Sequence, residues 1–177
     1  MFKFFRSAKN RAIIERLYGA IVAQSRQPVF YTDFAIPDTR EGRFELIVLH
    51  TVLVCHRLKG GDTPETALSQ DVFDAFADDM DRTLREMGVG DLSVPKRMKK
   101  IGAAFYGRAA AYDAGLGAQD NVALAQALAR NMFDDDNASA ETLAAYVRAS
   151  ATQLRETPFS TLARGDLPWP APDQFRG

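Results

Sequence analysis

The feature that most constrains this chain is the segment from Phe44 to Leu58, in which apolar side chains follow one another with few polar interruptions. When the segment is wound as a helix at about 100° per residue, apolar side chains face nearly every direction. Such a helix has no continuous polar face for water, so other helices have to cover it on all sides. The segment therefore predicts the central helix of a helical bundle.

Helical periodicity continues along most of the chain and is interrupted by residues that begin or end helices. Pro28 ends the first predicted helix, and Gly88 closes a later one. Asp38 is expected to cap the central helix, with Glu41 three positions on as in a capping box. Residues 29–37 are predicted to form an extended aromatic connector. The predicted helices cover about residues 10–25, 39–58, 69–87, 95–114, 121–132 and 140–155.

These segments predict an all-α fold, a single-domain bundle of about six helices. A length of 177 residues suits one domain with a real core. We expect one domain over residues 1–177, with a helical core over about residues 10–155 and an irregular, proline-rich tail over about residues 156–177. No apolar run approaches the ~20 residues that a membrane span needs. A net charge of −1 gives no overall attraction to nucleic acid or to anionic membranes.

Polar side chains on the central helix fall on two stripes. Arg43, His50 and Arg57 are spaced by seven and share one stripe, whereas Glu45 and His56 lie on another. Buried charges need partners, and the next predicted helix presents a row of carboxylates. One interpretation is a partly buried ion-pair seam that fixes helix register, and the other is a solvated seam. In the first interpretation the acidic partners are Asp74, Asp78 and Asp81.

The helix predicted at 95–114 carries a stripe of small residues roughly opposite its apolar face. Ala103, Gly107 and Ala111 are spaced by four, and small side chains at this spacing allow another helix to approach closely. The approaching helix belongs either to this domain or to a client or partner protein. In the second alternative the stripe is a docking groove for a helix.

Four cations crowd the first turns of the same helix. They oppose the helix dipole, which favours negative charge at the N-terminus, so folding gives no reason for their position. They form either a solvated face or a binding site for anions such as the phosphates of ribosomal RNA or lipid. The four residues are Lys96, Arg97, Lys99 and Lys100.

Motifs for enzyme chemistry are weak in this sequence. Acidic runs at 78–81 and 134–137 are similar to the two aspartate-rich magnesium sites of isoprenoid synthases, but the spacing differs and the chain is short for that fold. Cys55 lies within the apolar central helix and is expected to be a core residue rather than a nucleophile. His50 and His56 lie on different faces, so they do not make a two-histidine metal site. We therefore expect no catalytic residues, no metal site and no cofactor.

Several ordered blocks between Tyr18 and Tyr112 carry a family resemblance. The first group reads SRQPVFY at 25–31, IPDT at 36–39 and GRFEL at 42–46. The second group reads DMD at 79–81, LREMGVGDL at 84–92, PKRMKK at 95–100 and FYGR at 105–108. Together these blocks resemble the ubiquinol–cytochrome c chaperone family, and several blocks in order are more specific than one short motif.

The resemblance implies a non-catalytic assembly factor that binds newly made cytochrome b for the ubiquinol–cytochrome c reductase. It also implies two candidate partners, the ribosome near its exit site and a small partner subunit. Because the family-like region begins almost at once, we expect a bacterial-type member that is cytoplasmic or peripheral on the cytoplasmic face of the inner membrane. The alternatives are a small magnesium-dependent enzyme of isoprenoid type and a helical adaptor for another respiratory complex.

The N-terminus is a further candidate contact, in this case with an anionic membrane surface. It combines aromatic side chains with cations, a composition that suits a membrane interface. The alternative is a frayed end whose aromatic rings dock on the core. The residues concerned are Phe2, Lys3, Phe4, Phe5, Arg6, Lys9 and Arg11.

Overall fold

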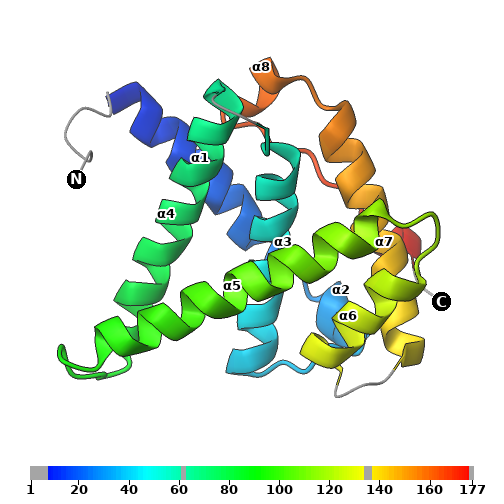
Figure 1. The fold of residues 1–177 in the computed structure, drawn as a ribbon, viewed down its shortest axis with the longest axis horizontal. Helices are drawn as coiled ribbons and strands as arrows, with labels where there is room; N and C mark the ends of the chain where they lie inside the picture. Colours follow the sequence, from blue (N-terminus) through cyan, green and yellow to red (C-terminus); the bar gives the residue numbers. More distant parts are fainter. Residues whose placement is uncertain (1–7, 61–62, 134–136, 176–177) are drawn as a thin grey trace.

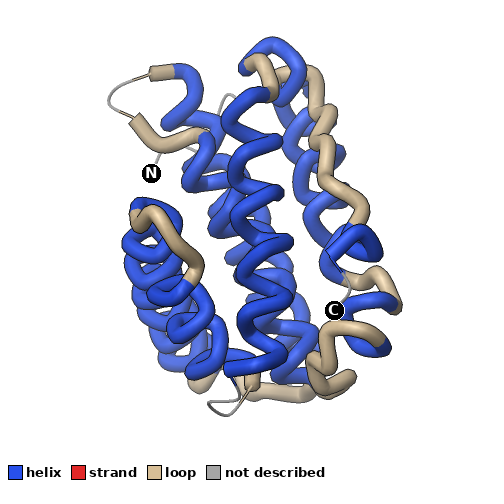
Figure 2. Tube along the Cα trace, turned by 90° about the vertical axis from the view of Figure 1, so that its right-hand side faces the viewer, coloured by secondary structure: helices blue, strands red, loops and turns tan. Residues whose placement is uncertain are grey.

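The computed structural model describes residues 8–60, 63–133 and 137–175, and in these ranges the chain consists of helices joined by turns and loops, with no strand (Figure 1). Figure 2 shows the same helices from the side. The prediction of an all-α, single-domain bundle is confirmed. The long helices are α1 (Ala8–Ser25), α3 (Arg40–Arg57), α4 (Pro64–Glu86), α5 (Val94–Gly117), α6 (Val122–Met132) and α7 (Asn137–Glu156). The short ones are α2 (Val29–Thr32), α8 (Phe159–Leu162) and the 3-10 turn η1 (Pro172–Phe175).

α3 lies at the centre of the bundle, as its apolar sequence predicts. Every residue from Glu45 to Val54 is buried, and α3 contacts α1, α4, α5, α6 and α7. Its first turn differs from the prediction because Thr39, and not Asp38, is the N-cap. The Thr39 hydroxyl accepts a hydrogen bond from the Gly42 amide at 3.1 Å. Asp38 instead accepts a hydrogen bond from the Arg43 guanidinium group.

α4 and α5 form a helical hairpin whose turn lies at one extremity of the molecule (Figure 1). α4 begins at Pro64 rather than near residue 69, because Thr63 accepts from the Thr66 amide and proline suits the first helical turn. Gly88 follows the end of α4, as predicted, and its φ of +78° is one that glycine adopts without strain. Ring contacts join the two helices, and they involve Phe73, Phe76, Phe105 and Tyr106.

The connector between α1 and α3 is more ordered than predicted. It is not extended throughout, because Val29–Thr32 forms the helical turn α2. Phe30 and Phe34 are fully buried, and both rings lie edge to face with Tyr146 of α7. Burial of these rings holds the connector against the core and overrides the extended pattern.

The segment after α7 is irregular apart from α8 and η1, and it packs along the body of the bundle. The Trp169 ring lies 5.1 Å from the His50 ring, and the Phe175 ring lies 5.9 Å from the Tyr146 ring, measured between centroids. The tail therefore covers the side of the core where α3 and α7 meet.

Candidate partner-binding surface

A network of buried polar groups connects α1, α3 and α7. The His50 ring donates through Nδ1 to the Leu46 carbonyl at 2.8 Å, because a carbonyl can only accept. Nε2 of His50 therefore accepts from the Tyr146 hydroxyl at 2.9 Å, and that hydroxyl accepts from the Gln24 amide at 2.9 Å. Burial lowers the pKa of His50 to about 4, so the ring is neutral at physiological pH. The network belongs to the core and not to a surface.

The structure corrects the predicted seam between α3 and α4. Arg43 is exposed and pairs with Asp38 at 2.7 Å, His50 bonds within the core, and Arg57 donates to two backbone carbonyls at the C-terminal end of α7. No ion pair joins these three side chains to α4 in the described part of the chain. Spacing by seven places residues on one stripe, but it does not identify the helix that faces the stripe. The carboxylates predicted as partners, on α4, are Asp74, Asp78 and Asp81.

An ion-pair seam is present between α3 and α5 instead, on the other polar stripe. Arg108 of α5 donates through Nε to Glu45 of α3 at 2.6 Å, and a second N–H of the same guanidinium group reaches the other carboxylate oxygen. Asp113 of α5 lies 2.6 Å from both His56 and Lys59. Burial opposes ionisation of Asp113, but its bonds to Lys59 and His56 outweigh burial and lower its pKa. These pairs fix the register of α5 on the central helix.

The small-residue stripe of α5 lies largely on the surface. Ala103 and Gly107 are exposed, and a Cβ atom added at Gly107 would meet no atom within 4 Å. Ala111 is half-buried and packs against the edge of the core. Close packing with another helix of this domain therefore does not explain Gly107. The outer face of α5 at Ala103 and Gly107 is open to a partner.

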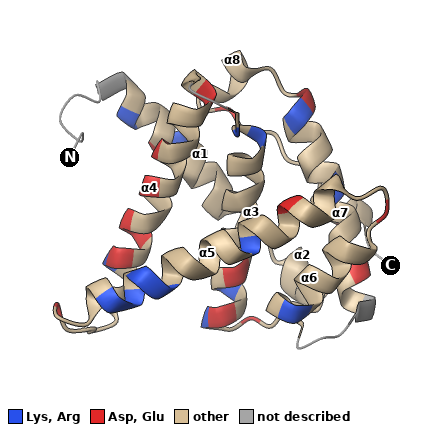
Figure 3. Cartoon of the chain, in the orientation of Figure 1, with Lys and Arg blue, Asp and Glu red and all other residues tan. Residues whose placement is uncertain are grey.

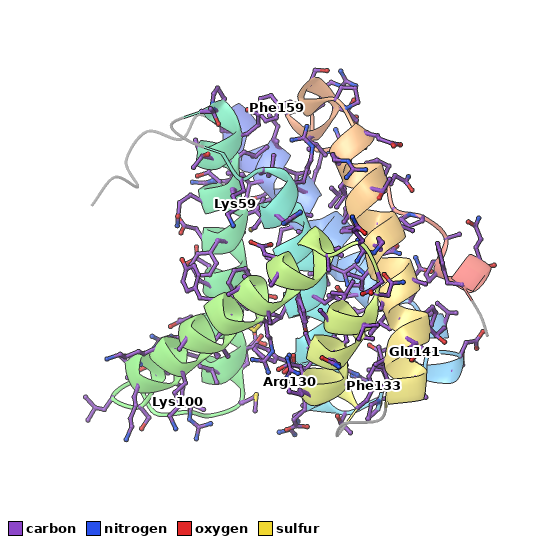
Figure 4. The ribbon with its side chains drawn as sticks, turned by 45° about the vertical axis from the view of Figure 1, so that its right-hand side comes forward. Lys59, Lys100, Arg130, Phe133, Glu141 and Phe159 are labelled. Carbon is purple, nitrogen blue, oxygen red and sulfur yellow. The ribbon has the colours of Figure 1, made fainter. Side chains whose placement is uncertain are left out.

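The predicted basic patch lies on the first turns of α5, next to this stripe. Figure 3 shows the cations gathered where α5 begins, whereas acidic residues follow α4. The Lys100 side chain points away from the body of the bundle (Figure 4). No ion pair to these cations occurs among the residues that the structure describes. All four side chains are exposed: Lys96, Arg97, Lys99 and Lys100.

Three exposed apolar side chains near this surface were missed in the sequence. Leu92, in the turn between α4 and α5, is 99% exposed, and Met87, at the start of the same turn, is 49% exposed. Tyr106, one turn along α5 from Ala103, is 61% exposed. A sequence signal for Leu92 exists, because a short connector between antiparallel helices offers no core in which to bury a leucine.

The candidate residues for enzyme chemistry form no metal-binding group in the described ranges. No group of three His, Cys, Asp or Glu side chains is placed there to hold a metal ion. Asp74 and Asp78 line an open groove of about 680 Å³ between α1 and α4, whereas Asp134 lies outside the described residues. Burial raises the pKa of Cys55 to about 11, which keeps the thiol protonated and unreactive.

Contacts with a membrane could involve either a spanning helix or the N-terminus. In the described ranges, no helix combines the length and the apolar character needed to cross a bilayer. Of the aromatic, basic N-terminus, residues 1–7 lie outside the described residues. Arg11 on α1 is described and is exposed.

Fold and surface together define the class of protein: an all-α domain in which one long helix, α5, carries exposed small residues and exposed cations. The chain belongs to the ubiquinol–cytochrome c chaperone family, because the family model of that description matches residues 32–169. The match extends the resemblance seen in the sequence through α6 and α7 and into the tail.

Relatives of known identity support the same family membership. The ubiquinol–cytochrome c reductase complex assembly factor 1 of Drosophila melanogaster is 29% identical over 159 residues, which are 85% of this chain and 61% of the relative. The mouse protein of the same name is 27% identical over 142 residues, which are 78% of this chain and 48% of the relative. This chain thus spans only about half to three-fifths of their length. The crystal structure of the Cbp3 homolog from Brucella abortus is 46% identical, with a TM-score of 0.86 and coverage of 94% of this chain and 93% of that one.

Proposed function

We propose that this protein is a non-catalytic assembly factor for the ubiquinol–cytochrome c reductase and that its client is newly made cytochrome b. The family and the names of the relatives support the assembly role. The observation that supports a helical client is the open face at Gly107, since a Cβ atom added there would meet no atom of the described residues within 4 Å. A client helix laid along this face could approach the α5 backbone closely, because the stripe lacks large side chains.

The role of this open face of α5 as a docking groove is tested by replacing Gly107 with Leu. The added side chain should block close approach of a client helix, while the domain folds normally, because leucine favours a helix more than glycine does by about 0.5–1 kcal/mol. The measurement is co-purification of cytochrome b with the tagged protein during synthesis, together with thermal unfolding. The matched control is Gly19→Leu on α1, where an added Cβ also meets nothing within 4 Å. Capture that is unchanged in Gly107→Leu would remove the groove from the proposal.

The client itself is tested in a strain that lacks the protein. We expect a lower level of assembled ubiquinol–cytochrome c reductase and of haem-loaded cytochrome b, measured by reduced-minus-oxidised spectra of membranes, with other respiratory complexes near normal. A normal level of haem-loaded cytochrome b would refute the assembly role. Loss of a different complex, with cytochrome b intact, would support an adaptor for that complex.

The proposal includes where the protein works and what else it meets. We place it in the cytoplasm, at the cytoplasmic face of the inner membrane, where newly made cytochrome b is inserted. Further partners in this proposal are the ribosome near its exit site, a small second subunit and, for the aromatic N-terminus, an anionic membrane surface. Cross-linking during synthesis, followed by identification of the linked chains, tests each of these partners.

A further inference from the structure

We propose that the turn between α4 and α5 docks on an anionic lipid bilayer, with the side chain of Leu92 inserted among the lipids. We call this region the α4–α5 tip. It contains two exposed apolar side chains and four exposed cations. Its members are Met87, Leu92, Lys96, Arg97, Lys99 and Lys100.

The first observation is the concentration of exposed apolar surface at the tip. Four large apolar side chains are exposed in the described part of the chain, and two of them, Met87 and Leu92, lie on this one turn. A leucine that is 99% exposed keeps its whole side chain in water when the protein is free. Removal of that side chain from water would stabilise any complex that covers it.

The second observation is the local charge. Residues 85–100 contain five cations and two anions, a net charge of +3, in a chain whose net charge is −1. Arg85 pairs with Asp81 and Asp91, and Glu86 is exposed nearby. The four cations at the start of α5 remain without an ion pair among the described residues. Their position opposes the helix dipole, so they do not serve the fold.

The third observation is the position of the tip. The turn lies at an extremity of the molecule, and Lys100 points outward from it (Figures 1 and 4). The apolar residues lie on the turn itself, and the cations follow on the first turns of α5. A flat anionic surface can therefore receive Leu92 while the cations reach lipid phosphates, as in interfacial segments of peripheral proteins.

A lipid surface fits these residues better than a nucleic acid does. RNA phosphates would attract the cations equally, but surfaces that bind single-stranded RNA stack its bases on aromatic rings, and Leu92 and Met87 provide none. Tyr106, the nearest exposed ring along α5, lies about two turns beyond Lys99. The apolar part of the tip therefore favours a lipid bilayer over RNA as the partner.

The experiment is flotation of the purified full-length protein with vesicles. We expect binding to phosphatidylcholine vesicles that contain 30% phosphatidylglycerol, no binding to pure phosphatidylcholine, and at least fivefold weaker binding at about 0.5 M salt than at about 0.05 M. Leu92→Ser should weaken binding at least fivefold, and the combined change of Lys96, Lys99 and Lys100 to Gln should abolish it. Val122→Ser, a change at another exposed apolar residue on α6, is the matched control.

Three results would overturn the proposal. If all variants float like the wild type, another part of the chain holds the bilayer. If Leu92→Ser floats normally while the Gln variant does not, the cations alone hold the vesicle and Leu92 does not insert among the lipids. Thermal unfolding of each variant shows that the fold is intact. Client capture in vesicle-free solution is a separate readout, so a protein that captures cytochrome b but does not float loses only this proposal.

Discussion

At the scale of single residues, the buried histidine of α3 makes stability depend on pH. Burial lowers the pKa of His50 to about 4, against about 6.5 in an unfolded chain. Between these values the unfolded chain binds a proton that the folded protein does not. The free energy of unfolding should therefore have its full value above about pH 6.5 and should fall by roughly 3 kcal/mol as the pH drops to about 4. Urea denaturation at a series of pH values measures this change.

The control for this prediction is His50→Gln, which does not titrate in this range. The variant should be less stable at neutral pH, because it disturbs the bonds to Leu46 and Tyr146, but its stability should change less between about pH 6.5 and 4. Other titrating groups, such as Glu45, whose pKa is raised by burial, contribute equally to the pH dependence of both proteins. The difference between the two pH profiles therefore reports His50 alone. Parallel pH profiles for the two proteins would contradict the assignment.

At the scale of elements, Arg148 joins α7 to the end of α5. Its guanidinium group donates to the carbonyls of Gly115, Leu116 and Asp120 and to the side chain of Asn121. Carbonyls at a helix C-terminus otherwise lack partners, and a cation there also complements the helix dipole. Arg148→Met should lower the free energy of unfolding by roughly 3 kcal/mol, measured by urea denaturation.

Arg155 is the control for Arg148, since both lie on α7 and line one cavity of about 410 Å³. Arg155 is exposed and makes no hydrogen bond in the described part of the chain. Arg155→Met should therefore change stability by less than about 0.5 kcal/mol. Similar losses in the two variants would show that charge in the cavity matters, rather than the carbonyl bonds.

The long helices and their order could be predicted from the sequence, but the short helices α2 and α8 and the faces that meet could not. Apolar periodicity identified α3 as the central helix, because burial leaves a direct pattern in residue type. One interpretation of the polar stripes placed an ion-pair seam against α4, whereas Glu45 pairs with Arg108 of α5 in the structure. Helix rotation and neighbour choice depend on many weak contacts that no short pattern encodes. The exposure of Gly107 likewise depended on which helices cover α5.

At the scale of the whole molecule, the C-terminal tail completes the core made by distant segments. Trp169 covers His50, and Phe175 covers Tyr146. Removal of residues 167–177 should therefore expose this side of the core and cost roughly 3–5 kcal/mol, seen as a lower midpoint of one cooperative thermal transition. Asp173→Ala, at an exposed tail residue, should leave the midpoint nearly unchanged. A truncated protein as stable as the full chain would show that the tail does not contribute to the core.

The unbroken length of α5 also fixes the distance between the start of the helix and Gly107. Ion pairs at Arg108 and Asp113 fasten its second half to the central helix, and the helix continues without a break back to Val94. At a rise of 1.5 Å per residue, the stretch from Val94 to Gly107 spans about 20 Å. α5 is therefore a rigid spacer of fixed length. Under the two proposals made above, it would hold a client segment at a fixed height above the bilayer, about two-thirds of the thickness of the hydrocarbon layer that the segment has still to enter.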